Sequence, residues 1–338
     1  MAISYRDSGV NIDEGNRTVA LIKKVLSKYK GKEQIGRFGG MYKIPENFSS
    51  PYLISSADGV GTKIKVAIMA GIYDTVGQDL VNHCVDDILV MGAKPLYFLD
   101  YFATGKLKAE IAASVVEGLA KACSENNCLL LGGETAEMPG FYAEGDFDLA
   151  GFITGIVEEN GVIDGSKIEK GDILIGFPST GLHTNGYSLA RKIFFDKLKM
   201  DINDIFTPTG RTVGEELLSI HKSYLNELFP LVEQGFIKGL AHVTGGGFYE
   251  NIPRILPKNR GVKIKIIWDI PPLFDFLVKE SGISMREAFR TFNMGIGMIA
   301  IVSKGKEELF SSQLKEKKAF LIGEITEGDG KVLIDGID

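Results

Sequence analysis

Four short stretches of this 338-residue chain combine carboxylates with glycines or with the end of an expected strand. They are Asp58-Gly59-Val60-Gly61-Thr62-Lys63, Asp86-Asp87, Asp100 and Gly132-Gly133-Glu134-Thr135-Ala136-Glu137. Glycine lets the backbone approach a ligand closely, and carboxylate oxygens suit a Mg²⁺ ion that holds phosphates. The combination indicates a site for a metal-bound polyphosphate. The common nucleotide fingerprints G-x-x-x-x-G-K-[ST] and G-x-G-x-x-G are both absent.

The helix that we expect from Thr75 to Met91 has an apolar stripe and a polar side. The polar side holds Asp79, His83, Asp86 and Asp87. A solvated helix face is the ordinary explanation for such acids. The nearby strands that are expected to end at Asp58 and Asp100 favour a ligand site instead, because α/β folds bind ligands at the ends of strands.

The Gly132–Gly140 segment follows directly after a strand that we expect at Cys128–Leu131. Two glycines at this point leave room for a phosphate or a ribose, and Glu134 can reach a metal ion. The alternative is a turn whose acids face water. Lys63 offers a point charge for phosphate, which favours the binding interpretation.

Two glycine-rich turns in the second half of the chain each contain a histidine. They are Gly181–Gly186 and His242–Phe248, each expected between a strand and a helix. Backbone N–H groups at a helix N-terminus can bind an anion. A histidine beside such a turn can be structural, or it can act as an acid, a base or a substrate-holding group. His83 and His221 have no glycine neighbours, and we interpret both as structural.

Composition excludes several classes of protein. The net charge of −6 and the charged share of 24% argue against a nucleic-acid partner. No run approaches 18 apolar residues and the N-terminus has no signal core, so we expect a cytoplasmic protein without membrane contact. Cys84, Cys123 and Cys128 form no C-x-x-C pair, which predicts buried thiols rather than zinc ligands or disulfides.

Strand and helix signals alternate in both halves and predict a mixed α/β fold. The chain is longer than one hydrophobic core supports, so we expect two domains. The boundary is placed in the turn-rich segment 161–171, which gives domains of residues 1–165 and 166–338. In the second domain we expect long helices at Gly186–Lys197 and Val213–Glu233.

Read together, the motifs resemble the family of phosphoribosylformylglycinamidine cyclo-ligases, also called aminoimidazole ribonucleotide synthetases. The similar blocks, in order, are 5–13, 58–63, 92–101, 132–140, 150–152, 181–187, 242–254 and 293–298. A single block would be weak evidence, because related ATP-using enzymes share an Asp- and Gly-rich core. The ordered set is specific and spans nearly the full chain.

The resemblance implies two α/β domains, the first contributing strands to a β-barrel at a homodimer interface. It also implies the substrates, ATP and formylglycinamidine ribonucleotide, and the products, aminoimidazole ribonucleotide, ADP and phosphate. Phosphorylation of the formamide oxygen would give an iminophosphate, which the neighbouring amidine nitrogen attacks to close the ring. The enzyme would then act through positioning and charge stabilisation.

The resemblance also implies roles for individual residues. Asp58, Asp87 and Glu134 are expected to bind ATP through Mg²⁺, and Asp100 is expected to support them. The residues expected to cradle or make room for phosphate are Gly59, Gly61, Thr62, Lys63, Gly132 and Gly133. In the second domain, the resemblance implies that the formamide or amidine end is oriented by His183 and Asn185, and that an anion such as the ribose phosphate is held by His242, Gly245, Gly246 and Gly247. It leaves open whether a monovalent cation also binds. Asp86 occupies a position where the family often has Asn.

Related enzymes and a different class of protein are the alternatives. Selenophosphate synthetase would need a reactive Cys near its N-terminus and a hydrogenase-maturation protein one at its C-terminus, and neither is present. Thiamine-monophosphate kinase also binds Mg·ATP through acidic clusters, but the blocks at 132–140 and 181–186 favour the cyclo-ligase. A nucleotide-binding scaffold without turnover is the last alternative, and the intact spacing of the clustered acids argues against it.

Overall fold

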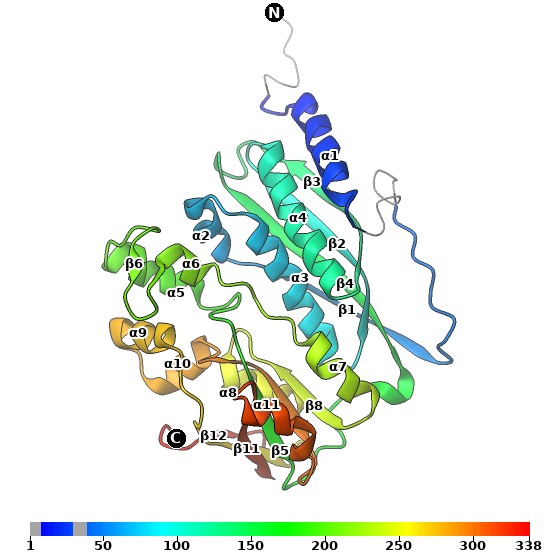
Figure 1. Cartoon of the computed structure of the whole chain (residues 1–338), viewed down its shortest axis with the longest axis vertical. Helices are drawn as coiled ribbons and strands as arrows, with labels where there is room; N and C mark the ends of the chain where they lie inside the picture. Colours follow the sequence, from blue (N-terminus) through cyan, green and yellow to red (C-terminus); the bar gives the residue numbers. More distant parts are fainter. Residues whose placement is uncertain (1–7, 30–38) are drawn as a thin grey trace, which may run out of the picture.

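The computed structural model describes residues 8–29 and 39–338. The first three residues of the 5–13 block therefore lie outside the described residues. Within the described part, the chain forms two main sheets that lie one above the other in Figure 1, each accompanied by helices. The mixed α/β prediction is confirmed at this level.

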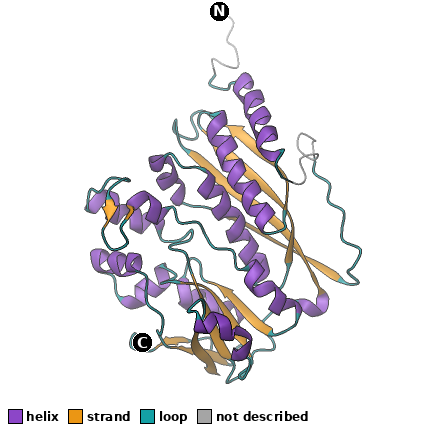
Figure 2. Ribbon diagram, in the orientation of Figure 1, coloured by secondary structure: helices purple, strands orange, loops and turns teal. Residues whose placement is uncertain are grey.

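The first sheet contains four strands and is covered by helices on one face (Figure 2). In spatial order the strands are β1 (Pro51–Gly59), β4 (Phe147–Glu158), β2 (Lys94–Thr104) and β3 (Leu129–Glu137). The helices are α1 (Ile12–Leu26), α2 (Lys63–Ala70), α3 (Asp74–Leu89) and α4 (Ala109–Glu125). Helices α3 and α4 pack on the sheet, and α1 packs on α4.

Alternation along the strands assigns the faces of this sheet. Phe98 of β2 and Ile153 of β4 are buried toward the helices, whereas Leu53 of β1 and Phe152 of β4 are exposed on the other face. Pairing aligns Asp58 with Gly151 and Gly151 with Asp100. Both acids therefore lie on the helix-covered face of the sheet.

The second sheet contains six strands around the fully buried strand β10 (Ile296–Val302). Its order is β12 (Val332–Ile334), β9 (Arg260–Ile264), β11 (Phe320–Glu327), β5 (Ile173–Pro178), β10 and β8 (Ile237–His242). The shorter elements are α5 (Tyr187–Arg191), η3 (Lys192–Lys197), β6 (Ile205–Phe206), β7 (Arg211–Thr212), α6 (Val213–Leu217), α7 (Leu225–Glu233), α8 (Gly247–Asn251), η4 (Ile252–Ile255), α9 (Pro272–Ser281), α10 (Met285–Thr291), η5 (Glu307–Phe310) and α11 (Ser311–Lys315). None of the helices in the described ranges is long and apolar enough to cross a membrane.

Three expectations about elements were wrong. Strand β3 continues through Gly132–Glu137, although we expected the strand to end at Leu131, because it pairs with β2 as far as Glu137. The helix expected at 186–197 divides into α5 and the π-helical η3. The helix expected at 213–233 is interrupted between α6 and α7 at residues 218–224, and this interruption shapes the site described next.

Candidate active site between the two sheets

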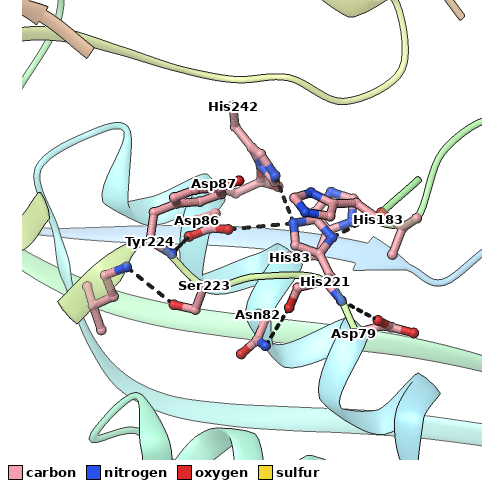
Figure 3. A network of polar contacts seen from close by, with 12 residues as sticks. Asp79, Asn82, His83, Asp86, Asp87, His183, His221, Ser223, Tyr224 and His242 are labelled. Atoms are coloured by element: carbon pink, nitrogen blue, oxygen red, sulfur yellow. Dashed lines mark hydrogen bonds and ion pairs between the residues drawn. The ribbon is translucent and has the colours of Figure 1, made fainter. Parts of the chain in front are cut away.

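All four histidines of the sequence meet between the two sheets (Figure 3). His83 comes from α3, His183 from the turn before α5, His221 from the segment between α6 and α7, and His242 from the end of β8. The ring centroids of His183 and His221 are 4.0 Å apart, and those of His221 and His242 are 5.1 Å apart. None is more than 6% exposed. We had interpreted His83 and His221 as structural and separate, but they belong to the same cluster as His183 and His242.

Two carboxylates are paired with this cluster. Asp58 Oδ2 lies 2.8 Å from His83 Nε2, and Asp87 Oδ1 lies 2.9 Å from His242 Nδ1. Burial would raise the pKa of both carboxyl groups, but the histidine hydrogen bonds and charges lower both values below their ordinary range. Both side chains keep some exposure, 39% for Asp58 and 26% for Asp87. The cluster therefore presents two ionised carboxylates to solvent.

The histidines contact one another and a threonine through their other nitrogens. His221 Nε2 is 3.1 Å from His242 Nε2, and Thr184 Oγ1 is 2.8 Å from His83 Nδ1. Burial lowers the pKa of His183, His221 and His242, and neighbouring imidazoles lower it further. These shifts favour the neutral form of all three rings.

The polar side of α3 binds the backbone of the interrupted segment. Asp79 Oδ1 accepts from His221 N at 2.7 Å, and Asp86 Oδ1 accepts from Tyr224 N at 2.9 Å. Asn82 Nδ2 donates to His221 O at 2.7 Å. These bonds replace the intrahelical bonds that residues 218–224 would otherwise make, which explains the helix break. The alternative of a solvated α3 face is wrong, since Asp79 and Asp86 are buried against residues 218–224.

Lys63 is buried rather than open to a ligand. Its ammonium group donates to Asp79 Oδ1 at 2.9 Å, to Ser219 O at 2.7 Å and to His183 O at 3.2 Å. An ammonium has three donors, and all three are engaged here. Our expectation that Lys63 offers its charge to phosphate is therefore corrected, because the side chain ties α2 and α3 to the second half of the chain.

Unlike Lys63, the other residues of the Asp58–Lys63 motif form a turn after β1 close to the one expected. Gly59 N donates to Asp58 Oδ1 at 2.7 Å, which fixes the carboxylate. Gly61 has φ +61°, a conformation that favours glycine. Thr62 Oγ1 is 3.1 Å from Ser188 Oγ of α5. The turn thus brings the Asp58 motif against the glycine-rich turn of the second half.

The predicted residues of the second half lie side by side. A Cβ at Gly245 would be 3.3 Å from Asn185 Oδ1, so the two turns are in contact. His183 has φ +61°, and its Nε2 accepts from Thr180 N at 3.2 Å. Gly246 and Gly247 have φ values of +90° and +57° at the start of α8. This part of the predicted site is formed by residues far apart in the sequence.

Glu134 belongs to a different place from Asp58 and Asp87. It lines a cavity of about 640 Å³ beside β3, together with Asp100, Gly132 and Gly133. Burial raises the pKa of Asp100 to about 7, and nearby Glu134 raises it too. Among the described residues, the His, Cys, Asp and Glu groups close enough to share a metal ion are His183, His221 and His242, and His83, Asp87 and His242. The three carboxylates predicted for Mg²⁺ do not converge.

The two exposed carboxylates alone suit Mg²⁺. This ion is usually held by one or two carboxylates together with the phosphates of a substrate, and Asp58 and Asp87 supply two.

The prediction of buried thiols is confirmed, since Cys84, Cys123 and Cys128 are free and buried. The arrangement is that of a polar site between two α/β units with a solvent-facing acidic edge.

The sequence matches two family models in succession. Residues 42–157 match the N-terminal domain of AIR synthase related proteins, and residues 169–336 match the C-terminal domain. These matches define the class of protein to which the fold and site belong.

Curated relatives narrow that class. The chain is 51% identical to phosphoribosylformylglycinamidine cyclo-ligase from Caldanaerobacter subterraneus subsp. tengcongensis, over 98% of this chain and 100% of the relative. It is 48% identical to the enzyme of the same name from Syntrophotalea carbinolica, over 96% of this chain and 94% of the relative. The chain belongs to the phosphoribosylformylglycinamidine cyclo-ligase family.

Solved structures share the fold at low identity. Thiamine-monophosphate kinase from Stenotrophomonas maltophilia aligns with a TM-score of 0.64 at 14% identity, over 95% of this chain and 96% of that one. The hydrogenase maturation protein HypE of E. coli aligns with a TM-score of 0.65 at 16% identity, over 94% of this chain and 93% of that one. These likenesses concern the fold alone.

Proposed function

We propose that this chain is an ATP-dependent cyclo-ligase that converts formylglycinamidine ribonucleotide to aminoimidazole ribonucleotide, ADP and phosphate in purine biosynthesis. The observation that carries the proposal is near 50% identity, over the whole chain, to relatives of that name. A carboxylate of the first half, Asp87, is paired with a histidine of the second, His242, and this contact between the halves supports a site built for two substrates. We also propose domains of residues 1–165 and 166–338, and a cytoplasmic location.

The reaction has two bond-exchanging steps. The formamide oxygen attacks the γ-phosphorus of ATP, the bond to the β-phosphate oxygen breaks, ADP leaves, and the formamide nitrogen loses its proton to give the iminophosphate. The amidine nitrogen then attacks the iminophosphate carbon, loses a proton, and phosphate departs. Alignment of the reacting groups and stabilisation of developing charge are the main contributions available to a protein in such chemistry.

The residues divide between the two halves of this reaction. Asp58 and Asp87, held by Gly59 N and by histidines, form the ATP side. We assign His183 and His242, which lie in the cluster beside these acids, to the amidine end of the substrate. We assign Asn185 and the triplet Gly245, Gly246 and Gly247 to substrate orientation, because their turns are in contact.

Asp58 and Asp87 are the residues that would hold Mg²⁺ with ATP. A bound divalent ion neutralises phosphate charge during transfer. Glu134 and Asp100 line the neighbouring cavity, which we propose as the place of the nucleoside part of ATP. The glycines Gly132 and Gly133 leave the wall of that cavity without side chains.

We further propose that the uncovered face of the first sheet forms a homodimer interface, with strands joining those of a second copy in a barrel. Leu53 and Phe152 are large apolar residues at least 46% exposed on that face. Apolar patches of this kind mark association sites. Phe152→Asp should shift the protein toward monomer in analytical ultracentrifugation, and an unchanged dimer would reject this interface.

A direct assay tests the function. Purified protein is incubated with formylglycinamidine ribonucleotide, ATP and Mg²⁺, and ADP and aminoimidazole ribonucleotide are measured. We expect the two products in equal amounts. Absence of substrate-dependent ADP would reject the cyclo-ligase, and formation of thiamine diphosphate from thiamine monophosphate would support the kinase alternative instead.

A further inference from the structure

The groups between the two sheets have the composition of a transition-metal site. One ring nitrogen each of His83 and His242 and one oxygen of Asp87 all lie within 4.8 Å of one another. Asp58 Oδ2 lies 2.8 Å from His83 Nε2 but is not part of this group of three. Two imidazoles and one carboxylate supply three donors, which leave the fourth position of a tetrahedral ion for solvent or a ligand.

The spacing of the donors is close to that around a coordinated ion. Metal–ligand bonds of about 2.0–2.1 Å at tetrahedral angles place neighbouring donors about 3.3 Å apart. The observed contacts are 2.8 Å between His83 Nε2 and Asp58 Oδ2, and 2.9 Å between His242 Nδ1 and Asp87 Oδ1. An ion that replaces the two bridging protons would therefore require only small movements of these side chains.

Each histidine has a hydrogen-bond partner for the nitrogen that faces away from the carboxylates. His83 Nδ1 is 2.8 Å from Thr184 Oγ1, and His242 Nε2 is 3.1 Å from His221 Nε2. Metal-binding histidines commonly donate their second N–H to such a partner, which fixes the tautomer and the ring orientation. Thr184 and His221 can both accept that hydrogen bond.

Each carboxylate is anchored in the same way. Asp58 Oδ1 accepts from Gly59 N at 2.7 Å, and Asp87 Oδ2 accepts from Ser56 Oγ at 2.9 Å. The other oxygen of each carboxylate faces a histidine. His83, His242 and Asp87 thus direct one donor each toward a common region and have their remaining polar atom held by a neighbour, and Asp58 is anchored beside them.

The other group of three histidines is less suitable. His183 is stacked on His221 with 24° between the ring planes and 4.0 Å between the centroids. Nearly parallel rings direct their lone pairs side by side rather than toward one point. The geometry favours the group made of His83, Asp87 and His242.

We propose that His83, His242 and Asp87, with Asp58 beside them, bind a divalent transition-metal ion through mixed nitrogen and oxygen ligands. Imidazole nitrogens favour ions such as Zn²⁺ over Mg²⁺, which prefers oxygen. The exposed edges of Asp58 and Asp87 provide access from solvent. The inference shares these two acids with the proposed ATP site, and to that extent it rests on the proposed function.

The first measurement uses the untagged full chain without ATP or substrate. Mn²⁺ is added, and electron spin echo modulation reports whether ¹⁴N nuclei couple to the ion. We expect ¹⁴N coupling from imidazole, and one Zn²⁺ bound per chain at least about 100-fold more tightly than Mg²⁺. Binding of Mn²⁺ without ¹⁴N coupling would overturn the proposal for the wild-type protein, whatever the variants do.

Four variants locate the ligands. His83→Asn keeps a polar atom toward Thr184 but removes Nε2, and His242→Gln keeps one toward His221 but removes Nδ1. Each of these two variants should weaken Zn²⁺ binding more than about 100-fold. Thr184→Val removes only the hydrogen-bond partner of His83 Nδ1 and should weaken it about 10–100-fold. Asp74→Asn is the matched control: this acid at the other end of the same helix has Oδ2 bound to Gln78 Nε2, so Zn²⁺ affinity should be unchanged.

The result is independent of the cyclisation assay. Product formation with Mg²⁺ but no ¹⁴N coupling rejects the metal site and leaves the proposed function standing. ¹⁴N coupling that disappears in His83→Asn or His242→Gln supports the site even if no cyclisation is detected. Equal Zn²⁺ affinities for the wild type, His83→Asn and His242→Gln, each checked for folding by circular dichroism, reject it.

Discussion

The histidine cluster and the cavity beside β3 show two different uses of acidic residues. At the cluster, Asp58 and Asp87 are paired with histidines, and their pKa values are lowered. In the cavity, no cationic side chain among the described residues offsets the burial of Asp100, and its pKa is raised to about 7. Similar motifs in the sequence therefore give ionised carboxylates in one region and, at neutral pH, a carboxyl group that is about half protonated in the other.

The difference follows from what each region packs against. The cluster lies between two sheets, where Asp58 is paired with His83 of the first half and Asp87 with His242 of the second. The cavity is lined mostly by apolar residues of the first half, from α1, α4, β2, β3 and β4. Charge is stabilised where a histidine nitrogen faces the acid, and it is disfavoured where the acid faces apolar walls and a second acid, Glu134.

The largest effect is expected from the buried ion pair beneath the cluster. Lys63→Met leaves Asp79 buried without its cation, which should lower the free energy of unfolding by about 3–5 kcal/mol. Urea denaturation measures it. Lys106→Met, which removes an exposed pair with Glu144, is the control and should cost less than about 1 kcal/mol. Equal small losses would show that Lys63 does not hold the two halves together.

The cavity predicts a pH dependence of stability. Because the folded-state pKa of Asp100 is about 7 and the unfolded value is about 3.9, the folded state retains a proton that the unfolded chain loses. This contribution to stability therefore falls between about pH 4 and pH 7 and is constant above. Asp100→Asn has no carboxyl group to titrate at this position. The difference in free energy of unfolding between the variant and the wild type should therefore rise, from pH 4 to pH 7, by up to about 4 kcal/mol in favour of the variant. Parallel pH profiles in urea denaturation would contradict the raised pKa.

The next effect separates the two regions in ATP binding. Asp58→Asn removes a charged group from the cluster and should weaken ATP binding in the presence of Mg²⁺ at least about tenfold, or 1.4 kcal/mol. Glu134→Gln, in the cavity, should have a smaller effect. Equilibrium dialysis with ATP measures both. Equal losses would show that Glu134 and Asp58 act on the same ion, as the sequence had predicted.

The smallest effect concerns two neighbouring glycines of β3. A Cβ at Gly133 would lie 2.2 Å from Asp100 Oδ1 and 2.7 Å from the Asp100 backbone oxygen, whereas one at Gly132 meets nothing closer than 3.8 Å. Gly133→Ala should therefore cost about 1–3 kcal/mol of unfolding free energy. Gly132→Ala should change it by less than about 0.5 kcal/mol. Similar values for both would mean that Asp100 moves freely in the cavity.

Local patterns were enough to predict much of the fold. Strand β4 was expected at 147–157 and is found at Phe147–Glu158, and α3 was expected at 75–91 and is found at Asp74–Leu89. These elements follow from apolar periodicity within each segment. The order of the motifs along the chain also predicted the family, which the identity to the relatives confirms.

Local patterns failed where long-range contacts decide the backbone. The segments on both sides of residues 218–224 have helical spacing, yet Asp79, Asn82 and Asp86 bind backbone groups of this segment and keep it out of a helix. Likewise β3 continues through its two glycines because β2 supplies the pairing partners. In both cases the groups that decide the backbone conformation belong to other segments of the chain, so the local sequence does not reveal them.

Residue types and motif order determined the family, the alternating elements and the list of acids and histidines. Only the tertiary structure decided which of them meet: it turned Lys63 inward, separated Glu134 from Asp87, and brought His83 and His221 to His183 and His242. The physical reason is that hydrogen bonds, ion pairs and burial depend on distances between segments far apart in the chain. A sequence pattern describes each segment separately, whereas pKa values and the geometry of a binding site depend on the contacts between segments.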